Sequence, residues 1–358
     1  MADQHSLVET RGGVVGGVDT HKDTHVVAAK DGLGRVLGTQ AFPTTAAGYA
    51  ALLGWLRGWG PVVAVGVEGT GSYGAGLARY LTGQDVRVVE VNRPDRAKRR
   101  QKGKSDPQDA INAAAAVQSG DATAVPKAGI GVVEAIRVLR TTRISAVKSR
   151  TAALNQLESL IVTAPAALRE TLTGLTGTAL VSRCARLRSG SDLTDPTPAT
   201  KTALRRLARR VQLLTDEITD ADTELRALTT QAAPRTLTRF GVGPDTAAQL
   251  LTTAGDNPHR LFSDAAFAHL CGTAPINASS GHTTRHRLNR GGDRNANAAL
   301  YRIVIVRLRY CEQTQAYLTK RTQQGLSKRD IIRCLKRYVA REIYNTIRAD
   351  LTNLTNTT

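Results

Sequence analysis

The sequence predicts a mixed α/β domain followed by mainly helical domains, and three observations lead to this fold class. Residues 14–120 alternate short β-like runs with helical stretches, whereas strand signals vanish over residues 131–231. In that second part, apolar residues recur at helical spacing over long stretches. The chain has 358 residues, 41% of them hydrophobic, which is enough for two or three domains with substantial cores.

The first domain is expected to begin with three strands, because short β-like runs alternate with glycine and aspartate turns. The continuous apolar run at 62–67 is typical of a buried central strand. The strands are expected at 14–19, 24–30, 35–42, 62–67 and 86–91, and the helices at 45–58, 72–81 and 105–120. Ser105 is expected to cap the last helix, and Pro107 suits its first turn. This order of elements is that of a ribonuclease H-like sheet.

The central part is expected to form a long helical hairpin. Helical stretches at 131–162 and 199–230 are separated by the segment 190–201, which contains glycine and proline. In the second stretch, apolar residues recur at intervals of three, four or seven: Leu204, Leu207, Val211, Leu214, Ile218, Leu225 and Leu228. This spacing favours a coiled-coil arm, with a plain helical bundle as the alternative.

A Gly-x-Gly turn between two helical stretches indicates a helix-hairpin-helix at residues 237–251. Such a turn presents backbone N–H groups that suit a phosphate, although an ordinary helical turn with glycine caps gives the same pattern. Further helices are expected at 293–310 and 328–349. A strand is the alternative for 301–310, because apolar and basic residues alternate there.

The charge balance indicates a nucleic-acid partner. Lys and Arg total 49 against 30 Asp and Glu, which gives a net charge of +19. Residues 282–350 hold 16 basic and 5 acidic residues, and the segment 93–104 holds seven basic residues and one acid. The excess of basic residues in these two segments indicates surfaces that bind phosphates. The alternatives are a solvated helix face for the first segment and a disordered linker for the second. Aromatic residues make up only 4% of the chain, so stacking on many bases is not the expected mode of binding.

Composition argues against several other classes of protein. The first residues lack the apolar core of a signal peptide, and no apolar run reaches the roughly 18 residues of a membrane span. The four cysteines are scattered without a CxxC pair, which argues against a disulfide framework or a cysteine zinc site. We therefore expect a cytoplasmic nucleic-acid-binding protein without a membrane partner.

Four acidic residues stand where a ribonuclease H-like fold would bring them together. Asp19 and Glu68 end the first and fourth strands, which are neighbours in such a sheet. Asp106 and Asp109 are three residues apart on one helix and share a face. Clustered carboxylates repel one another unless a divalent ion neutralises them, and oxygen ligands favour Mg²⁺ or Mn²⁺, two of which promote phosphodiester cleavage. Taken singly, each acid also suits an ordinary role at a turn or a helix entry.

Two histidines and one competing fold also bear on this region of the chain. His21 and His25 lie near the first acid, and without a cysteine partner they are expected to orient neighbours or to pack. A sugar-kinase or actin-like fold also begins with GVD and uses glycine-rich turns such as EGTGSYG. That fold needs an ATP site, which no later glycine motif supplies, and the charge of +19 and the paired Asp106 and Asp109 also argue against it.

A set of motifs extends along nearly the whole chain, from about Val14 to about Ile347. They are GVDTHKDTH, VEGTGSYG, VNRPDRAKRRQKGKSDPQDA, RTAALNQLESLIVTAP, GVGPDTAAQLL, FAHLCGTAPINASSG, HRLNRGGDRNANAAL and KRDIIRCLKRYVARE. With these motifs in this order, the chain resembles the DEDD insertion-sequence transposases, which are the bridge-RNA-guided recombinases. The resemblance implies a RuvC-like metal-dependent nuclease domain at 12–125, a helical arm at 126–233 and a serine-bearing transposase domain at 234–350.

The resemblance also implies which residues carry the chemistry. The metal-binding acids of the family fall on the four residues named above: Asp19, Glu68, Asp106 and Asp109. The family's catalytic serine falls on Ser280 in the segment APINASSG, with Ser279 as the neighbouring alternative. Its attack on phosphorus would give a covalent 5′-phosphoserine. Contacts to nucleic acid are expected from Arg93, Arg96, Lys98, Arg99, Arg100, Lys102, Lys104, Arg285, Arg287, Arg290 and Arg294.

The partners that the resemblance implies are donor and target DNA, a structured guide RNA, and further copies of the chain in a homodimer or homotetramer. Base pairing with the RNA would then choose the site, while the protein contacts backbones. The resulting hypothesis is a Mg²⁺-dependent, RNA-guided DNA recombinase that moves a mobile element. Two alternatives stay open: a RuvC-like hydrolytic junction endonuclease that does not use the serine, and a non-enzymatic nucleic-acid-binding protein.

Overall fold

The computed structural model describes residues 12–91, 105–282 and 286–356. The chain divides into two compact units. The first comprises the chain up to Gly129 together with Gly255–Phe262, and the second comprises Ile130–Ala254 and the chain from Ser263 onward. Among the helices described, none is long and apolar enough to cross a membrane.

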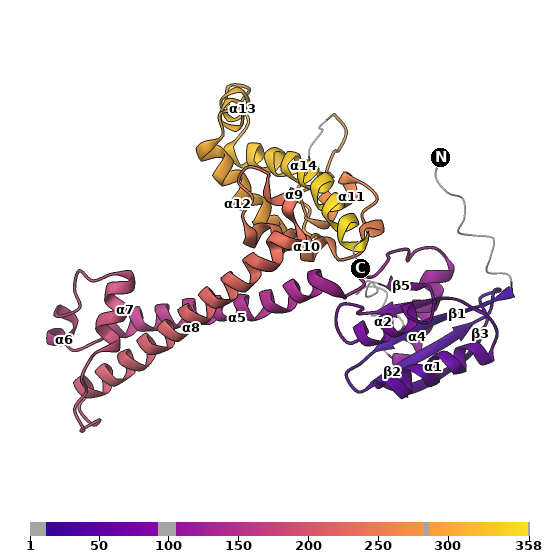
Figure 1. The fold of residues 1–358 in the computed structure, drawn as a ribbon, viewed down its shortest axis with the longest axis horizontal. Coiled ribbons are helices and arrows are strands. Elements are labelled where there is room, and N and C mark those ends of the chain that lie inside the picture. The colour runs from indigo at the N-terminus through magenta and orange to yellow at the C-terminus, as the bar shows by residue number, and fades with distance from the viewer. Residues whose placement is uncertain (1–11, 92–104, 283–285, 357–358) are drawn as a thin grey trace. The chain divides into compact units, whose positions relative to one another are not determined.

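A five-stranded mixed sheet forms the centre of the first unit (Figure 1). Its order is β3-β2-β1-β4-β5, with β2 antiparallel to both β1 and β3, β4 parallel to β1, and β5 parallel to β4. The strands are β1 (Val14–Thr20), β2 (Thr24–Lys30), β3 (Val36–Pro43), β4 (Val62–Glu68) and β5 (Val88–Val91). The prediction that the first and fourth strands are neighbours inside the sheet is confirmed, and the arrangement is consistent with a ribonuclease H-like domain.

Helices cover both faces of this sheet. On one face lies α1 (Ala46–Gly58), because a Cβ added at Gly16 would contact the side chain of Leu56. On the other face lies α4 (Asp106–Gln118), because a Cβ added at the next residue, Gly17, would meet the backbone of that helix. Successive residues of a strand face opposite sides, so the two helices sandwich the sheet.

The hydrophobic core of the first unit lies between the sheet and the helices α1 and α2 (Ala75–Thr82). Its fully buried side chains include Val18, Val65, Val67, Leu52, Leu56, Leu77 and Leu81. Helix α2 begins at Ala75 rather than at residue 72, because the preceding residues form a turn. In that turn the backbone N–H groups of Ser72 and Gly74 both donate to the carbonyl of Gly69.

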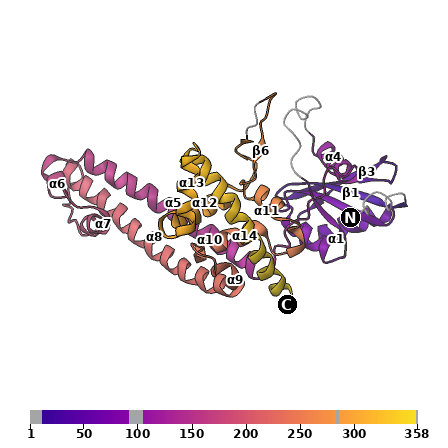
Figure 2. The ribbon, with the colours of Figure 1, turned by 90° about the horizontal axis from the view of Figure 1, so that it is seen from above.

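The second unit begins with two long helices that lie side by side (Figures 1 and 2). Its first helices are α5 (Gly131–Val162), α6 (Ala166–Glu170), α7 (Gly177–Ala185) and α8 (Pro196–Ala232). Helix α5 has the predicted bounds, whereas α8 extends beyond the predicted 199–230 at both ends. At its start, the Asp195 carboxylate accepts a hydrogen bond of 2.7 Å from the N–H of Thr197. The short α6 and α7 share a local core with the ends of the long pair.

The rest of the second unit is helical apart from one short hairpin. It comprises α9 (Pro234–Leu237), α10 (Pro244–Ala254), α11 (Asp264–Leu270), β6 (Ile276–Asn277), β7 (His286–Arg287), α12 (Arg294–Tyr310), α13 (Glu312–Gln323) and α14 (Lys328–Asn356). The strand alternative for 301–310 is wrong. That segment continues α12, whose buried residues Ala299, Leu300, Ile303 and Val304 recur at helical spacing. Helix α13 is not among the predicted elements.

Candidate active site

The carboxyl ends of β1 and β4 bring two acidic residues to one edge of the sheet. Val18 on β1 is paired in parallel register with Val67 on β4, so the residues that follow them, Asp19 and Glu68, occupy equivalent positions on neighbouring strands. Both acids are about 6% exposed. The hydroxyl of Thr20 donates a 2.9 Å hydrogen bond to the backbone carbonyl of Glu68, which ties the two strand ends together.

A pair of glycines sets the distance between this sheet and α4. Gly17 and Gly66 are register partners on β1 and β4. A Cβ at Gly17 would overlap the Ala110 carbonyl oxygen and the Ala114 backbone nitrogen, and a Cβ at Gly66 would lie 2.9 Å from the Ala113 carbonyl oxygen. The helix therefore rests on the backbone of the two central strands, and its alanines are buried there.

The first turn of α4 carries the other two predicted acids. Asp109 is buried at 4% exposure, whereas the side chain of Asp106 is 44% exposed. Ser105 is the N-cap residue of this helix, as predicted: its backbone carbonyl accepts the N–H of Asp109, although its hydroxyl makes no capping hydrogen bond in the described structure. Pro107 lies in the first turn, as predicted.

His21 lies between β1 and α4 and contacts an acid from each. Its Nε2 atom is 3.4 Å from the Oδ2 of Asp19 and 3.2 Å from the Oδ2 of Asp106. The three side chains each offer a ligand atom, and these atoms lie within 4.8 Å of one another. This group matches the donor types that hold a divalent cation, with Glu68 on the adjacent strand and Asp109 one helical turn further along.

The two histidines therefore have different places. From the sequence, both were expected to orient neighbours or to pack. His21 contacts the acids, whereas His25 is fully buried and stacks on Tyr49 with ring centroids 5.7 Å apart. Burial lowers the pKa of His25, so this imidazole is neutral at neutral pH. Only the spacing Asp-x-His at the end of a strand signals His21 in advance.

The predicted nucleophile lies in the second unit. Ser280 is exposed and lies in the segment that joins β6 to β7, with Ser279 beside it, also exposed. Gly281 follows with a positive φ of 54°, a conformation that glycine adopts easily. The four acids belong to the first unit. The meeting of serine and acids therefore stays a prediction.

The predicted nucleic-acid contacts are only partly described. Three of them are exposed in the second unit: Arg287 on β7, Arg294 at the start of α12, and Arg290 between these two elements. The remaining predicted basic residues lie outside the described residues: Arg93, Arg96, Lys98, Arg99, Arg100, Lys102, Lys104 and Arg285.

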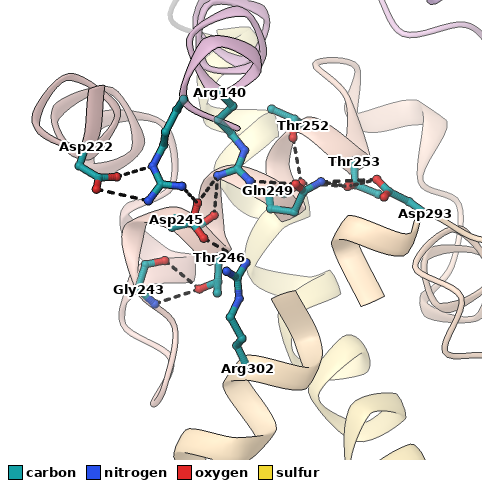
Figure 3. Close-up of polar contacts among 11 residues, drawn as sticks. Arg140, Asp222, Gly243, Asp245, Thr246, Gln249, Thr252, Thr253, Asp293 and Arg302 are labelled. Atoms are coloured by element: carbon teal, nitrogen blue, oxygen red, sulfur yellow. Dashed lines mark hydrogen bonds and ion pairs between the residues drawn. The ribbon is translucent and has the colours of Figure 1, made fainter. Parts of the chain in front are cut away.

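The turn predicted to hold a phosphate is occupied by the protein's own side chains. The N–H of Gly243 donates a 3.0 Å hydrogen bond to the hydroxyl of Thr246, and Asp245 stands in the first turn of α10 (Figure 3). A phosphate would compete with Thr246 for this N–H and would meet the Asp245 carboxylate. The described geometry thus argues against a phosphate site at this turn.

Asp245 is instead the centre of an ion cluster that joins three helices to α10 (Figure 3). Its carboxylate pairs with Arg140 and Arg143 of α5 and with Arg302 of α12, and Arg143 also pairs with Asp222 of α8. Burial alone would raise the pKa of Asp245, but the three guanidinium charges outweigh it and hold the pKa below its ordinary value. This cluster is not among the features expected from the sequence.

Comparison with protein families gives two matches. Residues 16–164 match the model of the DEDD transposase domain of the IS110 type, described as a transposase. Residues 222–319 match the model described as transposase IS116/IS110/IS902 family. Together they span more than two thirds of the chain, with the four acids in the first match and Ser280 in the second. A search of curated proteins gives no match.

Proposed function

This chain carries the two transposase domains of the IS110 family, and we propose that it is a metal-dependent transposase that joins DNA strands through a serine-bound intermediate. The observation that carries the proposal is the contact of one histidine, His21, with acids from two elements that are far apart in the sequence. Asp19 lies at the carboxyl end of β1, and Asp106 is the first residue of α4. This helix packs closely on the sheet because Gly17 and Gly66 have no side chains.

The acids fit a hard divalent cation. Asp19, Asp106, Glu68 and Asp109 offer carboxylate oxygens, which Mg²⁺ prefers and Mn²⁺ also accepts. Bound there, such an ion supplies positive charge that stabilises the charge developing on a phosphodiester. His21 holds two of the carboxylates in place, since its Nε2 lies within 3.4 Å of both.

Ser280 is the proposed nucleophile. Its Oγ attacks the phosphorus of a phosphodiester, the P–Oγ bond forms, and the bond to the 3′ oxygen breaks. The serine proton ends on that 3′ hydroxyl, and the 5′-phosphate stays on the protein. A 3′ hydroxyl of the partner strand then attacks the same phosphorus, and Ser280 leaves with its proton restored. One ester replaces another in each step, so the reaction needs no external energy source. Arg287 and Arg290 are proposed to hold the phosphates of the scissile strand.

The proposed partners follow from the charge and from the family. A structured guide RNA is proposed to select donor and target DNA by base pairing, while basic residues contact backbones. We propose that α5 and α8 form a coiled-coil arm, which joins two or four copies of the chain so that acids and serine can come from different copies. Residues 237–251 are proposed to be a helix-hairpin-helix within the serine-bearing domain. The proposed site of action is the cytoplasm.

The test uses the full chain, RNA that co-purifies from its native locus, and junction DNA of the mobile element. With Mg²⁺ we expect recombinant DNA and a protein–DNA adduct that survives denaturation. Asp19→Asn should abolish recombination with DNA binding retained. The matched control is Asp85→Asn, at an exposed acid with a φ of 57° that asparagine tolerates, and it should keep full activity.

The alternatives give different results in the same test. A hydrolytic junction endonuclease would cut the DNA in the presence of Mg²⁺ without any adduct and would be unaffected by Ser280→Ala. A non-enzymatic binding protein would bind without metal and break no strand. Full recombination by Asp19→Asn would overturn the proposed role of the acidic cluster.

A further inference from the structure

A small cavity lies between α12, α13 and α14 in the second unit. Its volume is about 170 Å³. The apolar part of its wall comes from Val304, Leu335 and Val339, and its polar part includes Arg307, Tyr317 and Tyr338. All of these helices belong to the basic C-terminal stretch, in which residues 282–350 hold 16 basic and 5 acidic residues.

Two tyrosines form an aromatic edge of this cavity. The rings of Tyr317 and Tyr338 meet at 89° with centroids 5.7 Å apart, and Tyr338 is 52% exposed. The guanidinium of Arg321 lies 5.9 Å from the Tyr317 ring. Burial, together with the hydrogen bond that the Tyr317 hydroxyl donates to Tyr338, raises the pKa of Tyr317 to about 12, so this phenol carries no negative charge at neutral pH. Neutral aromatic rings beside guanidinium groups are the usual platform for an unpaired base and its phosphates.

Arg307 contributes a hydrogen-bond donor that the described residues leave without an acceptor. Its Nε donates to the carbonyl of Phe240 at 2.9 Å, and its Nη1 pairs with Glu342 at 2.7 Å. Its Nη2 is buried and has no acceptor among the described residues. A buried donor in this state favours a ligand that brings an acceptor oxygen.

The size of the cavity limits what it can hold. An engineered cavity of about 150 Å³ in another protein accommodates a benzene ring. A cavity of about 170 Å³ thus fits one six-membered ring and leaves less room for the two fused rings of a purine. A pyrimidine nucleotide combines such a ring with carbonyl oxygens that can accept hydrogen bonds from the polar side chains of the wall, and its phosphate suits the surrounding positive charge.

From these observations we infer that the cavity between α12, α13 and α14 binds a single unpaired pyrimidine of a nucleic-acid strand. The ring enters between the apolar wall and Tyr338, and the flanking phosphates contact arginines such as Arg321. The inference uses the proposed function only in that the chain acts on nucleic acid, because neither the acidic cluster nor Ser280 takes part in the binding.

The experiment measures binding of short fluorescent single strands to the full chain in EDTA, so that no cleavage occurs. Each strand is a purine run with one central position that is a pyrimidine, a purine or an abasic site. One set of strands is DNA and the other is RNA, and the set with the larger base effect identifies the source of the ligand. We expect the chain to bind the pyrimidine strand about tenfold more tightly than the abasic strand, the effect of one stacked base.

Two variants connect this effect to the cavity. Tyr338→Ala should weaken binding of the pyrimidine strand about tenfold and leave binding of the abasic strand unchanged. The effects of the substitution and of removing the base are then not additive. Val304→Phe should do the same by filling the cavity while every surface side chain stays in place. Trp59→Ala removes a comparably exposed aromatic residue from the first unit and should leave the preference unchanged.

Other results would overturn the inference. Equal binding of pyrimidine and abasic strands by the unmodified chain would show that no base is bound in the cavity. Equal binding of purine and pyrimidine strands would exclude a pocket limited to one ring. An unchanged preference in both Tyr338→Ala and a folded Val304→Phe would place the base elsewhere. Asp19→Asn and Ser280→Ala should keep the preference, so failure of the proposed catalysis and failure of this inference are distinguishable.

Discussion

Gly17 and Gly66 are register partners on the two adjacent parallel strands of the sheet, and α4 rests on both. Neither position has room for a Cβ, because the atoms that it would meet include the helix backbone. The close approach brings the first turn of α4 to the carboxyl end of β1. There, His21 contacts Asp19 and Asp106 at once. The lack of side chains at Gly17 and Gly66 thus allows the acids of α4 to approach those of the sheet.

Replacing Gly17 by alanine should therefore displace α4. We expect the free energy of unfolding to fall by about 1–3 kcal/mol, the usual effect of overpacking a core, as measured by chemical denaturation. Gly54→Ala is the control, because an added Cβ at this position of α1 meets nothing within 4 Å and should stabilise the helix slightly. Unchanged stability of Gly17→Ala would contradict the close packing of α4 on β1.

His21 should contribute to cation binding by positioning the carboxylates. His21→Ala is expected to weaken Mn²⁺ binding about tenfold without unfolding the chain, since residues that orient metal ligands have effects of this size. Calorimetric titration of the full chain measures the affinity. His259→Ala, at an exposed histidine on the short 3₁₀ helix Pro258–Arg260, is the control and should leave the affinity unchanged.

The two neighbouring serines can be separated by their products. Ser280→Ala should abolish the denaturation-resistant protein–DNA adduct, whereas Ser279→Ala should retain it, because only one hydroxyl acts as the nucleophile. Gel electrophoresis under denaturing conditions and peptide mapping of the adduct provide the measurement. An adduct that maps to Ser279 would move the assignment by one residue without changing the proposed chemistry.

The fold of the first unit was largely predictable because its signals are local. Strand-length apolar runs, glycine turns and the order of elements predict that β1 and β4 are neighbours, and hence that Asp19 and Glu68 share one edge. The helical bounds 131–162 follow in the same way from the spacing of apolar residues. At 301–310 apolar and basic residues alternate, which also suits a strand. Only the burial of one face of α12 against neighbouring helices shows that this segment is helical.

Features that depend on long-range packing could not be predicted. His21 contacts Asp106 only because α4 folds back onto the sheet, and no spacing rule connects residues so far apart. The cavity beside Tyr338 needs three helices, one of which, α13, has no strong apolar pattern. The ion cluster at Asp245 likewise joins four helices, although the sequence suggested only a glycine turn there.

That cluster predicts how stability depends on pH. The pKa of Asp245 in the folded chain lies below the ordinary value of about 3.9, because Arg140, Arg302 and Arg143 outweigh the effect of burial. A carboxylate of this kind stabilises the fold fully above its ordinary pKa, and the contribution is lost as the pH falls through the lowered folded-state pKa. At neutral pH, Asp245→Asn leaves the 6% exposed Arg140 side chain without its counter-charge.

We therefore expect Asp245→Asn to lower the free energy of unfolding by about 1–3 kcal/mol at pH 7, the range for a hydrogen bond to a charged group. Below about pH 4 the difference from the unmodified chain should shrink, because the carboxyl group becomes protonated first in the unfolded chain and only at lower pH in the folded one. Thermal denaturation between pH 7 and pH 2 measures both effects, with the exposed Asp216→Asn on α8 as the control. If the two stability curves stay parallel below pH 4, Asp245 does not carry the charge-dependent stabilisation assigned to it.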